Sequence, residues 1–210
     1  MDNAKFKLGP FAALIVVWIA AGLALRFFEA WRDPFLVILG PLLWSFVGLC
    51  LLLFMLWRIW KARRPRGAMI AAAMIALAWA MVVFAGDPVG WAGTKWRFGQ
   101  LKPDYLALIA ELREDPGLAD DNWRSAAFGF YRVSAAPPLR VAFAWPGGAI
   151  DNWSGVIYDP TGFVMEANRF KADFSNWFDP ELAEVKGVFP GETLFGCRPL
   201  EGPFYFCWFT

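Results

Sequence analysis

The sequence predicts a membrane protein in which three N-terminal transmembrane α-helices precede a small α+β domain of one helix and about six mostly antiparallel strands. Hydrophobic residues make up 58% of the 210-residue chain and the mean hydropathy is +0.41, above the usual composition of soluble domains. The apolar residues gather in three charge-free N-terminal segments, and after residue 126 their spacing changes to the alternation of strands. We therefore expect a transmembrane region at 1–86, a linker along the membrane surface at 87–102 and an extracytoplasmic domain at 103–210.

The three apolar segments are each about long enough to cross a hydrocarbon core of about 30 Å as a helix that rises about 1.5 Å per residue. They are Leu8 to Leu25, Phe35 to Trp57 and Ala68 to Ala85, and none contains a charged residue. A buried helix of a soluble protein would account for one such segment, but three in succession favour membrane spans. The first segment also has the basic start of a signal peptide. Its apolar run exceeds the usual signal core of about 7 to 15 residues, so we expect a retained helix.

The basic residues of the short loops predict the orientation. The loop after the second segment carries five basic residues and no acid, namely Arg58, Lys61, Arg63, Arg64 and Arg66. The positive-inside rule assigns this loop to the cytoplasm, where its charges favour anionic lipid headgroups. Three crossings then put the N-terminus in the cytoplasm and the chain after Gly86 outside. The usage of Ala, Gly, Arg and Pro favours a bacterial source, so the expected location is the inner membrane with a periplasmic C-terminal domain.

The two halves of the chain carry opposite net charges, which agrees with a protein whose N-terminal loops and C-terminal domain lie on different sides of a membrane. Residues 1–86 hold nine lysines and arginines against three acids, a net +6, and residues 87–210 hold eleven against sixteen, a net −5. The acidic outer domain excludes nucleic acid as an expected partner. Membrane lipids and another membrane or envelope protein are the partners that we expect.

The third apolar segment carries a stripe of small residues at spacings of four: Ala68, Ala72, Ala76 and Ala80. In lipid, such a stripe lets two helix backbones approach closely. We expect the stripe to pack against the other two helices, and docking onto another membrane protein is the alternative. The three apolar segments contain no acid, base or histidine, so the usual marks of an ion pathway are missing.

The outer domain is expected to begin with a helix at Pro103, a favourable first helical position, with an apolar face that includes Tyr105, Ile109 and Leu112. Asp159 to Gly162 predicts a hairpin turn. A mixed stretch follows at 168–186, with a short helix at Pro180 to Lys186. The expected strands are 126–134, 139–145, 154–158, 163–167, 193–198 and 204–209.

The sequence offers little for catalysis. It has no histidine, which removes the commonest general base and the commonest metal ligand. Asp151, Asp159 and Glu166 are the carboxylates that an acid and base pair would need. Asp151 and Asp159 lie in turn sequences, however, where aspartate hydrogen-bonds its own backbone. We therefore expect no enzyme, no catalytic residue, no metal and no cofactor.

Tryptophan provides the better functional indication. Tryptophan is enriched in interface hot spots and offers a flat face for stacking, although filling a core is the alternative. The outer domain is therefore expected to be an interaction domain of a non-enzymatic accessory subunit or envelope-complex component. A ligand-binding module for glycan, lipid or peptide is the second hypothesis. The candidate binding surface consists of Trp123, Trp145, Trp153 and Trp177.

Two of the three cysteines, Cys197 and Cys207, lie in the last two expected strands, on either side of a turn at Glu201 to Pro203. A reversal near Gly202 sets them opposite each other, and an oxidising compartment would let them bond. A metal site would need further ligands, and the ten-residue spacing differs from that of redox catalysts. We expect a disulfide, with two buried thiols as the alternative.

Overall fold

The computed structural model describes ten parts of the chain, which are residues 8–31, 34–62, 65–115, 117, 119, 121–134, 138–145, 153–170, 189 and 194–209. The chain divides into two compact units. The helical unit spans 1–29 and 35–94, and the sheet unit spans 30–34 and 95–210. The first unit is helical and the second contains the sheet, as the expected helical region and α+β region require.

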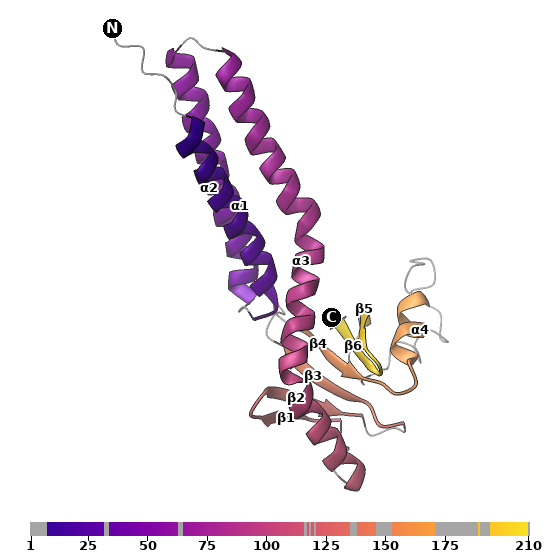
Figure 1. Ribbon diagram of the computed structural model, residues 1–210. Helices are drawn as coiled ribbons and strands as arrows, with labels where there is room; N and C mark the ends of the chain where they lie inside the picture. The colour runs from indigo at the N-terminus through magenta and orange to yellow at the C-terminus, as the bar shows by residue number, and fades with distance from the viewer. Residues whose placement is uncertain are drawn as a thin grey trace. The chain divides into compact units, whose positions relative to one another are not determined.

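Three long helices occur in the first 114 residues (Figure 1): α1 (Leu8–Phe27), α2 (Pro34–Ala62) and α3 (Pro65–Glu114), with a 3₁₀ helix η1 (Phe28–Trp31) after α1. Among the described residues, one helical stretch, Ala72–Glu114, is long and apolar enough to cross a membrane. The stretches Ala13–Phe27 and Leu39–Phe54 are apolar but shorter. The helical character of the N-terminal region is confirmed, and three membrane spans stay a prediction.

A cluster of three tryptophans joins the helices of the helical unit. The rings of Trp18 and Trp44 stack with centroids 4.2 Å apart. Each indole Nε1–H donates to the backbone carbonyl of the other residue, at 3.3 Å from Trp18 and 2.9 Å from Trp44. Trp79 of α3 lies 5.8 Å from Trp44, and Gly48 leaves space that the Trp18 ring fills. Both polar N–H groups therefore find acceptors inside an apolar unit, as buried indoles require.

Farther along α3, three glycines face the end of α1. Gly86, Gly90 and Gly93 follow one another at spacings of four and three, which puts them on one side of the helix. A Cβ at Gly86 would lie 3.2 Å from the Arg26 side chain, and a Cβ at Gly93 would overlap the backbone carbonyl of Phe27. Glycine is needed at position 93 because the two backbones approach too closely for any side chain.

The linker expected at 87–102 is helical instead, because α3 continues from Pro65 to Glu114. The expectation followed from the glycines and tryptophans of this stretch, and glycine has a low helix propensity. Tertiary packing overrides that propensity, through the glycine contacts with α1 and through Phe98, which lies buried in the sheet unit. The helix expected to begin at Pro103 is the last part of α3.

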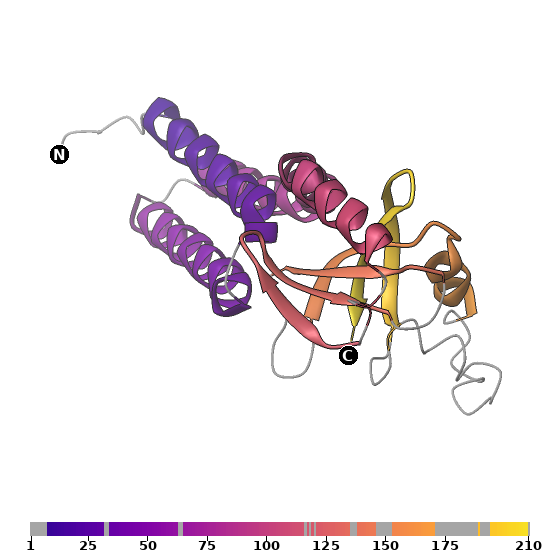
Figure 2. The ribbon, with the colours of Figure 1, turned by 90° about the horizontal axis from the view of Figure 1, so that it is seen from below.

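The sheet unit contains six strands, all paired antiparallel in the order β1-β2-β3-β4-β6-β5. Figure 2 shows the strands fanned side by side. The predicted six-stranded, antiparallel character of this region is confirmed. The strands are β1 (Trp123–Ala126), β2 (Gly129–Val133), β3 (Val141–Trp145), β4 (Trp153–Tyr158), β5 (Leu194–Glu201) and β6 (Phe204–Phe209).

One expected strand is wrong and another is longer than the strand that it contains, although the total is right. The expected strand 126–134 covers the last residue of β1, the turn and the whole of β2, and Gly129 permits the turn with φ of 127°. The expected strand 163–167 is the start of helix α4 (Phe163–Phe170), whose first amides are hydrogen-bonded by Asp159 and Thr161. The short helix expected at 180–186 lies outside the described residues.

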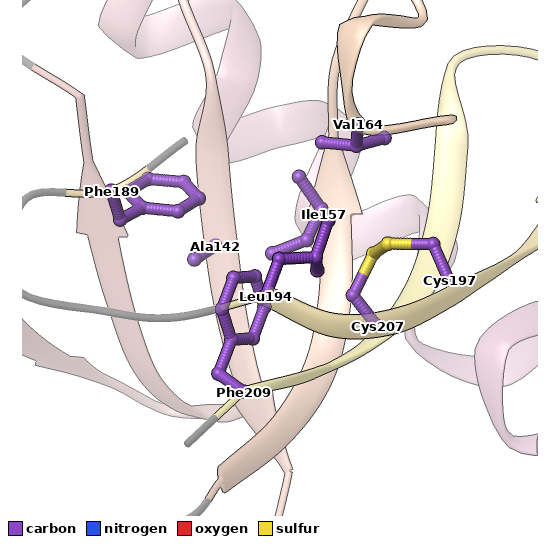
Figure 3. Packing of buried hydrophobic residues seen from close by; sticks show 8 residues of the cluster. All are labelled: Ala142, Ile157, Val164, Phe189, Leu194, Cys197, Cys207 and Phe209. Atoms are coloured by element: carbon purple, nitrogen blue, oxygen red, sulfur yellow. A yellow bond between two sulfur atoms is a disulfide. The ribbon is translucent and has the colours of Figure 1, made fainter. Parts of the chain in front are cut away.

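Side chains of successive strand residues point to opposite faces of the sheet, and each face packs against other elements. One face packs against the last part of α3, where Tyr105 stacks on Phe143 with centroids 3.9 Å apart and Phe98 lies 5.2 Å from Phe204. The other face packs against α4 and Phe189. Figure 3 shows the core of this second face, which consists of Ala142, Ile157, Val164, Phe189, Leu194, Cys197, Cys207 and Phe209.

The contact between Gly93 and Phe27 gives the first prediction. Gly93→Ala should lower the free energy of unfolding by about 3 kcal/mol, because a methyl group would force the backbones of α1 and α3 apart. Thermal unfolding of the full-length chain in mild detergent measures the effect. Gly99→Ala is the matched control, since nothing lies within 4 Å of its added Cβ. That control should be neutral or stabilising by up to about 1 kcal/mol, and equal destabilisation by both variants would contradict the close contact.

Candidate functional site

The two cysteines expected to pair do so. The sulfur atoms of Cys197 and Cys207 are 1.95 Å apart, and the two residues face each other in the register of β5 and β6. Gly202, with φ of 54°, provides the left-handed residue of the connecting turn. The disulfide lies in the core of the second sheet face, among apolar side chains. It joins two neighbouring strands and has the position of a structural bond.

The structure brings two of the four candidate tryptophans together. The rings of Trp123 and Trp153 meet edge to face with centroids 5.0 Å apart and planes at 89°. Trp153 in turn stacks on Phe209, at 4.2 Å and 9°. Trp123 is 39% exposed and Trp153 is half-buried. We call Trp123, Trp153 and Phe209 the aromatic row, and it is the candidate functional site.

The aromatic row joins residues of strands that are not neighbours in the sheet. Trp123 and Trp153 belong to β1 and β4, which β2 and β3 separate. Ala142 and Ala144 are the residues of β3 that point to this face, and Ala142 pairs with Arg132 of β2, which in turn pairs with Trp123. Gly155 lies opposite Ala144, and a Cβ there would overlap the backbone carbonyl of residue 143.

Trp145 does not belong to this surface. It is buried on the other face of the sheet, where its Nε1–H donates to the Tyr105 hydroxyl at 2.7 Å. The Arg97 guanidinium lies over its ring at 4.4 Å from the centroid. Burial raises the pKa of Tyr105 to about 12 and lowers the pKa of Arg97. Tyr105 is therefore protonated at neutral pH, and its buried hydroxyl accepts the hydrogen bond from Trp145 within the core. Trp177, the fourth candidate, lies outside the described residues.

Asp159, one of the three candidate acids, is fully buried and hydrogen-bonded. Its Oδ1 accepts from the backbone amide and hydroxyl of Thr161, at 3.1 and 2.6 Å, and from Nε of Arg140 at 3.3 Å. Its Oδ2 accepts from the backbone amide of Val164 at 2.9 Å, and its own amide donates to the carbonyl of Pro203 at 2.8 Å. Through these hydrogen bonds Asp159 connects the end of β4 with α4 and with the turn between β5 and β6.

The electrostatics of Asp159 agree with this structural role. Burial by itself would raise its pKa, but hydrogen bonds from Thr161 and Val164 and the charge of Arg140 outweigh burial and hold the pKa below its ordinary value. The carboxylate is therefore ionised and has no proton to give near neutral pH. Glu166 is exposed on α4, and Asp151 lies outside the described residues. The described residues contain no group of three His, Cys, Asp or Glu side chains that would hold a metal ion.

The alanine stripe is partly buried in the described part of the helical unit, and its packing role stays a prediction. Ala76 is exposed, and Ala72 and Ala80 are half-buried. The side chain of Ala68 is outside the described part. Buried apolar side chains of α3 in this unit include Ile75, Ala78 and Val82, and the first two belong to the core that contains Trp18.

The basic residues between α2 and α3 are described in part. Lys61 is exposed, and its Nζ lies over the ring of Trp57 at 5.4 Å from the centroid. The side chains of Arg58 and Arg66, and all of residues 63 and 64, are outside the described residues.

Phe209 was not singled out from the sequence although it supports the candidate site. A signal was present, because the expected bond at Cys207 fixes the inward face of β6 and Phe209 lies two residues farther on that face. Its stacking on Trp153 carried no such signal, since the pairing of β4 with β6 joins residues far apart in the chain.

Comparison of the chain with protein-family models, with curated proteins and with solved structures finds no match.

The contacts of Asp159 give the second prediction. Asp159→Asn should lower the free energy of unfolding by about 3 kcal/mol at pH 7, because it leaves Arg140 without its charged partner in a site that is largely buried. Since the folded-state pKa of Asp159 lies below its unfolded value of about 4, its carboxylate stabilises the fold above that pH. The contribution is lost as the pH falls through the folded-state value.

Thermal unfolding at a series of pH values measures both effects. The penalty of Asp159→Asn should be complete near pH 7 and shrink on acidification. Glu166→Gln, a change of an exposed acid on the same connection, is the control and should have little effect at pH 7. A penalty for Asp159→Asn that stays constant at every pH would contradict a stabilising carboxylate.

Proposed function

We propose that the chain is a non-enzymatic integral protein of the bacterial cytoplasmic membrane. The observation that carries this proposal is the outer surface of the helical unit, where all three helices expose large apolar side chains. Phe84 of α3 is 82% exposed, and the described surface also exposes Val16, Val17, Leu42, Leu43, Phe46, Leu53, Leu77 and Val83. A soluble surface rarely exposes apolar residues so continuously, whereas a bilayer covers them.

The sheet unit is proposed to lie on the periplasmic side. The loop charges favour this orientation, because the basic residues follow α2 and the chain after residue 87 is acidic. The bond between Cys197 and Cys207 also supports it, since disulfides persist in oxidising compartments and are rare in the cytoplasm.

The proposed role is that of an accessory subunit or envelope-complex component that binds another protein through the aromatic row. Trp123 is exposed, while Trp153 and Phe209 hold one another stacked behind it. A rigid, exposed tryptophan with fixed neighbours loses little side-chain freedom on binding and is typical of interface hot spots.

A ligand-binding module is the second candidate. The same perpendicular pair of indoles offers a flat face and an adjoining wall to a sugar ring, a lipid or an apolar peptide side chain. The two candidates share Trp123 and differ in the size of the molecule that covers it.

The proposed orientation predicts the accessibility of two positions. In a Cys50→Ser background, Ser125→Cys in the exposed strand β1 should react with a membrane-impermeant maleimide in intact spheroplasts. Lys61→Cys should react only after permeabilisation, because it lies at the end of α2 that the basic residues assign to the cytoplasm. The reverse pattern would refute the orientation, and extraction of the chain by alkaline carbonate would refute membrane insertion.

The proposed interaction predicts a specific loss. Chemical cross-linking in membranes, followed by mass spectrometry, should identify a protein adduct that Trp123→Ala reduces by about thirtyfold, since truncating a hot-spot residue costs on the order of 2 kcal/mol. Trp208→Ala is the matched control, because Trp208 is 36% exposed and points to the opposite sheet face.

The cross-linking also separates the two candidate functions. Loss of the adduct in both variants would mean that the sheet is perturbed generally, and an adduct retained in Trp123→Ala would refute the site. An adduct that soluble muropeptides or short apolar peptides displace through Trp123 would favour the ligand-binding module.

A further inference from the structure

The end of α2 combines exposed aromatic and basic side chains. Trp60 is 82% exposed and Trp57 is also exposed. Lys61, the basic residue of the last turn, holds its Nζ 5.4 Å from the centroid of the Trp57 ring. Two exposed indoles within one turn present an apolar surface to water, which is typical of a contact surface.

The position of these residues along α2 indicates what they contact. Exposed large apolar side chains on α2 extend from Leu39 to Leu56. Seventeen residue steps of about 1.5 Å give a length of about 26 Å, close to a hydrocarbon core of about 30 Å. Trp57 and Trp60 follow directly, at the depth where a bilayer changes from acyl chains to headgroups and where tryptophan is enriched.

The charge at this depth indicates the class of headgroup. Lys61 presents three N–H donors, and its contact with the Trp57 face orients the ammonium group without neutralising it. The sequence from residue 58 to residue 66 holds five basic residues and no acid. An anionic phospholipid satisfies this positive charge, whereas a zwitterionic headgroup carries its own ammonium group. A free anion in solution would leave Trp60 uncovered.

We propose that Trp57, Trp60 and Lys61 form a binding site for anionic phospholipid headgroups of the phosphatidylglycerol class. The indole rings lie against the glycerol and upper acyl region, their N–H groups donate to headgroup oxygens, and Lys61 pairs with the phosphate. The inference rests on the proposed membrane insertion and adds to it a preference among lipids that insertion by itself does not require.

The test uses the full-length chain in nanodiscs of phosphatidylcholine alone and of an equimolar mixture with phosphatidylglycerol. Native mass spectrometry after release measures the ratio of phosphatidylglycerol to phosphatidylcholine that stays bound. The wild type should retain phosphatidylglycerol preferentially. Lys61→Gln should lower that ratio by about fivefold, which corresponds to about 1 kcal/mol for one basic residue near an anionic surface. Lys61→Arg should preserve the preference, and Trp60→Ala should lower it.

Lys102→Gln is the matched control, since Lys102 belongs to the sheet unit and pairs with Glu201 at 2.7 Å. This variant should bind lipid as the wild type does. A wild-type chain without preference, or an equal loss in Lys61→Gln and Lys102→Gln, would overturn the site while leaving membrane insertion intact. Failure of the chain to enter nanodiscs of either composition would overturn insertion and the site together.

Discussion

The structure depends on helix α3, which supplies one side of the core in each of two units. Its first part places Ile75 and Ala78 against the tryptophans of the helical unit, and its last part stacks Tyr105 on the sheet. A single helix of 50 residues meets both requirements only because its inward residues change in kind along its length. Small residues and glycines allow close helix contact in the first part, and aromatic residues fill the space above strands in the last.

The sheet depends on having both faces covered. On one face, Trp145 is enclosed by the Arg97 guanidinium and the Tyr105 hydroxyl, so its polar N–H is satisfied within an aromatic core. On the other face, α4 covers the disulfide, and Asp159 fixes the start of that helix through its carboxylate. The buried charge is tolerated because Arg140 and three other donors surround it. Of the aromatic row, Phe209 is buried in this core, Trp153 is half-buried and Trp123 is exposed.

Tryptophan therefore has three different roles in one chain. Trp18 and Trp44 satisfy one another's N–H groups across two helices, Trp145 belongs to a closed core, and Trp123 stays exposed at an edge strand. The proposed functions use the exposed members alone: Trp123 toward a partner and Trp60 toward lipid. This division follows from the dual nature of indole, which has a large apolar surface and a single donor that must be satisfied wherever it is buried.

The sequence by itself determined the helical N-terminal region, the antiparallel character of the sheet and the bond between Cys197 and Cys207. These features depend on local periodicity and on a short turn, which neighbouring residues specify. Tertiary structure decided that residues 87–102 are helical and that Trp145 is buried while Trp123 is exposed. Those outcomes depend on contacts between residues distant in the chain, such as Gly93 with Phe27, and no local pattern encodes such contacts.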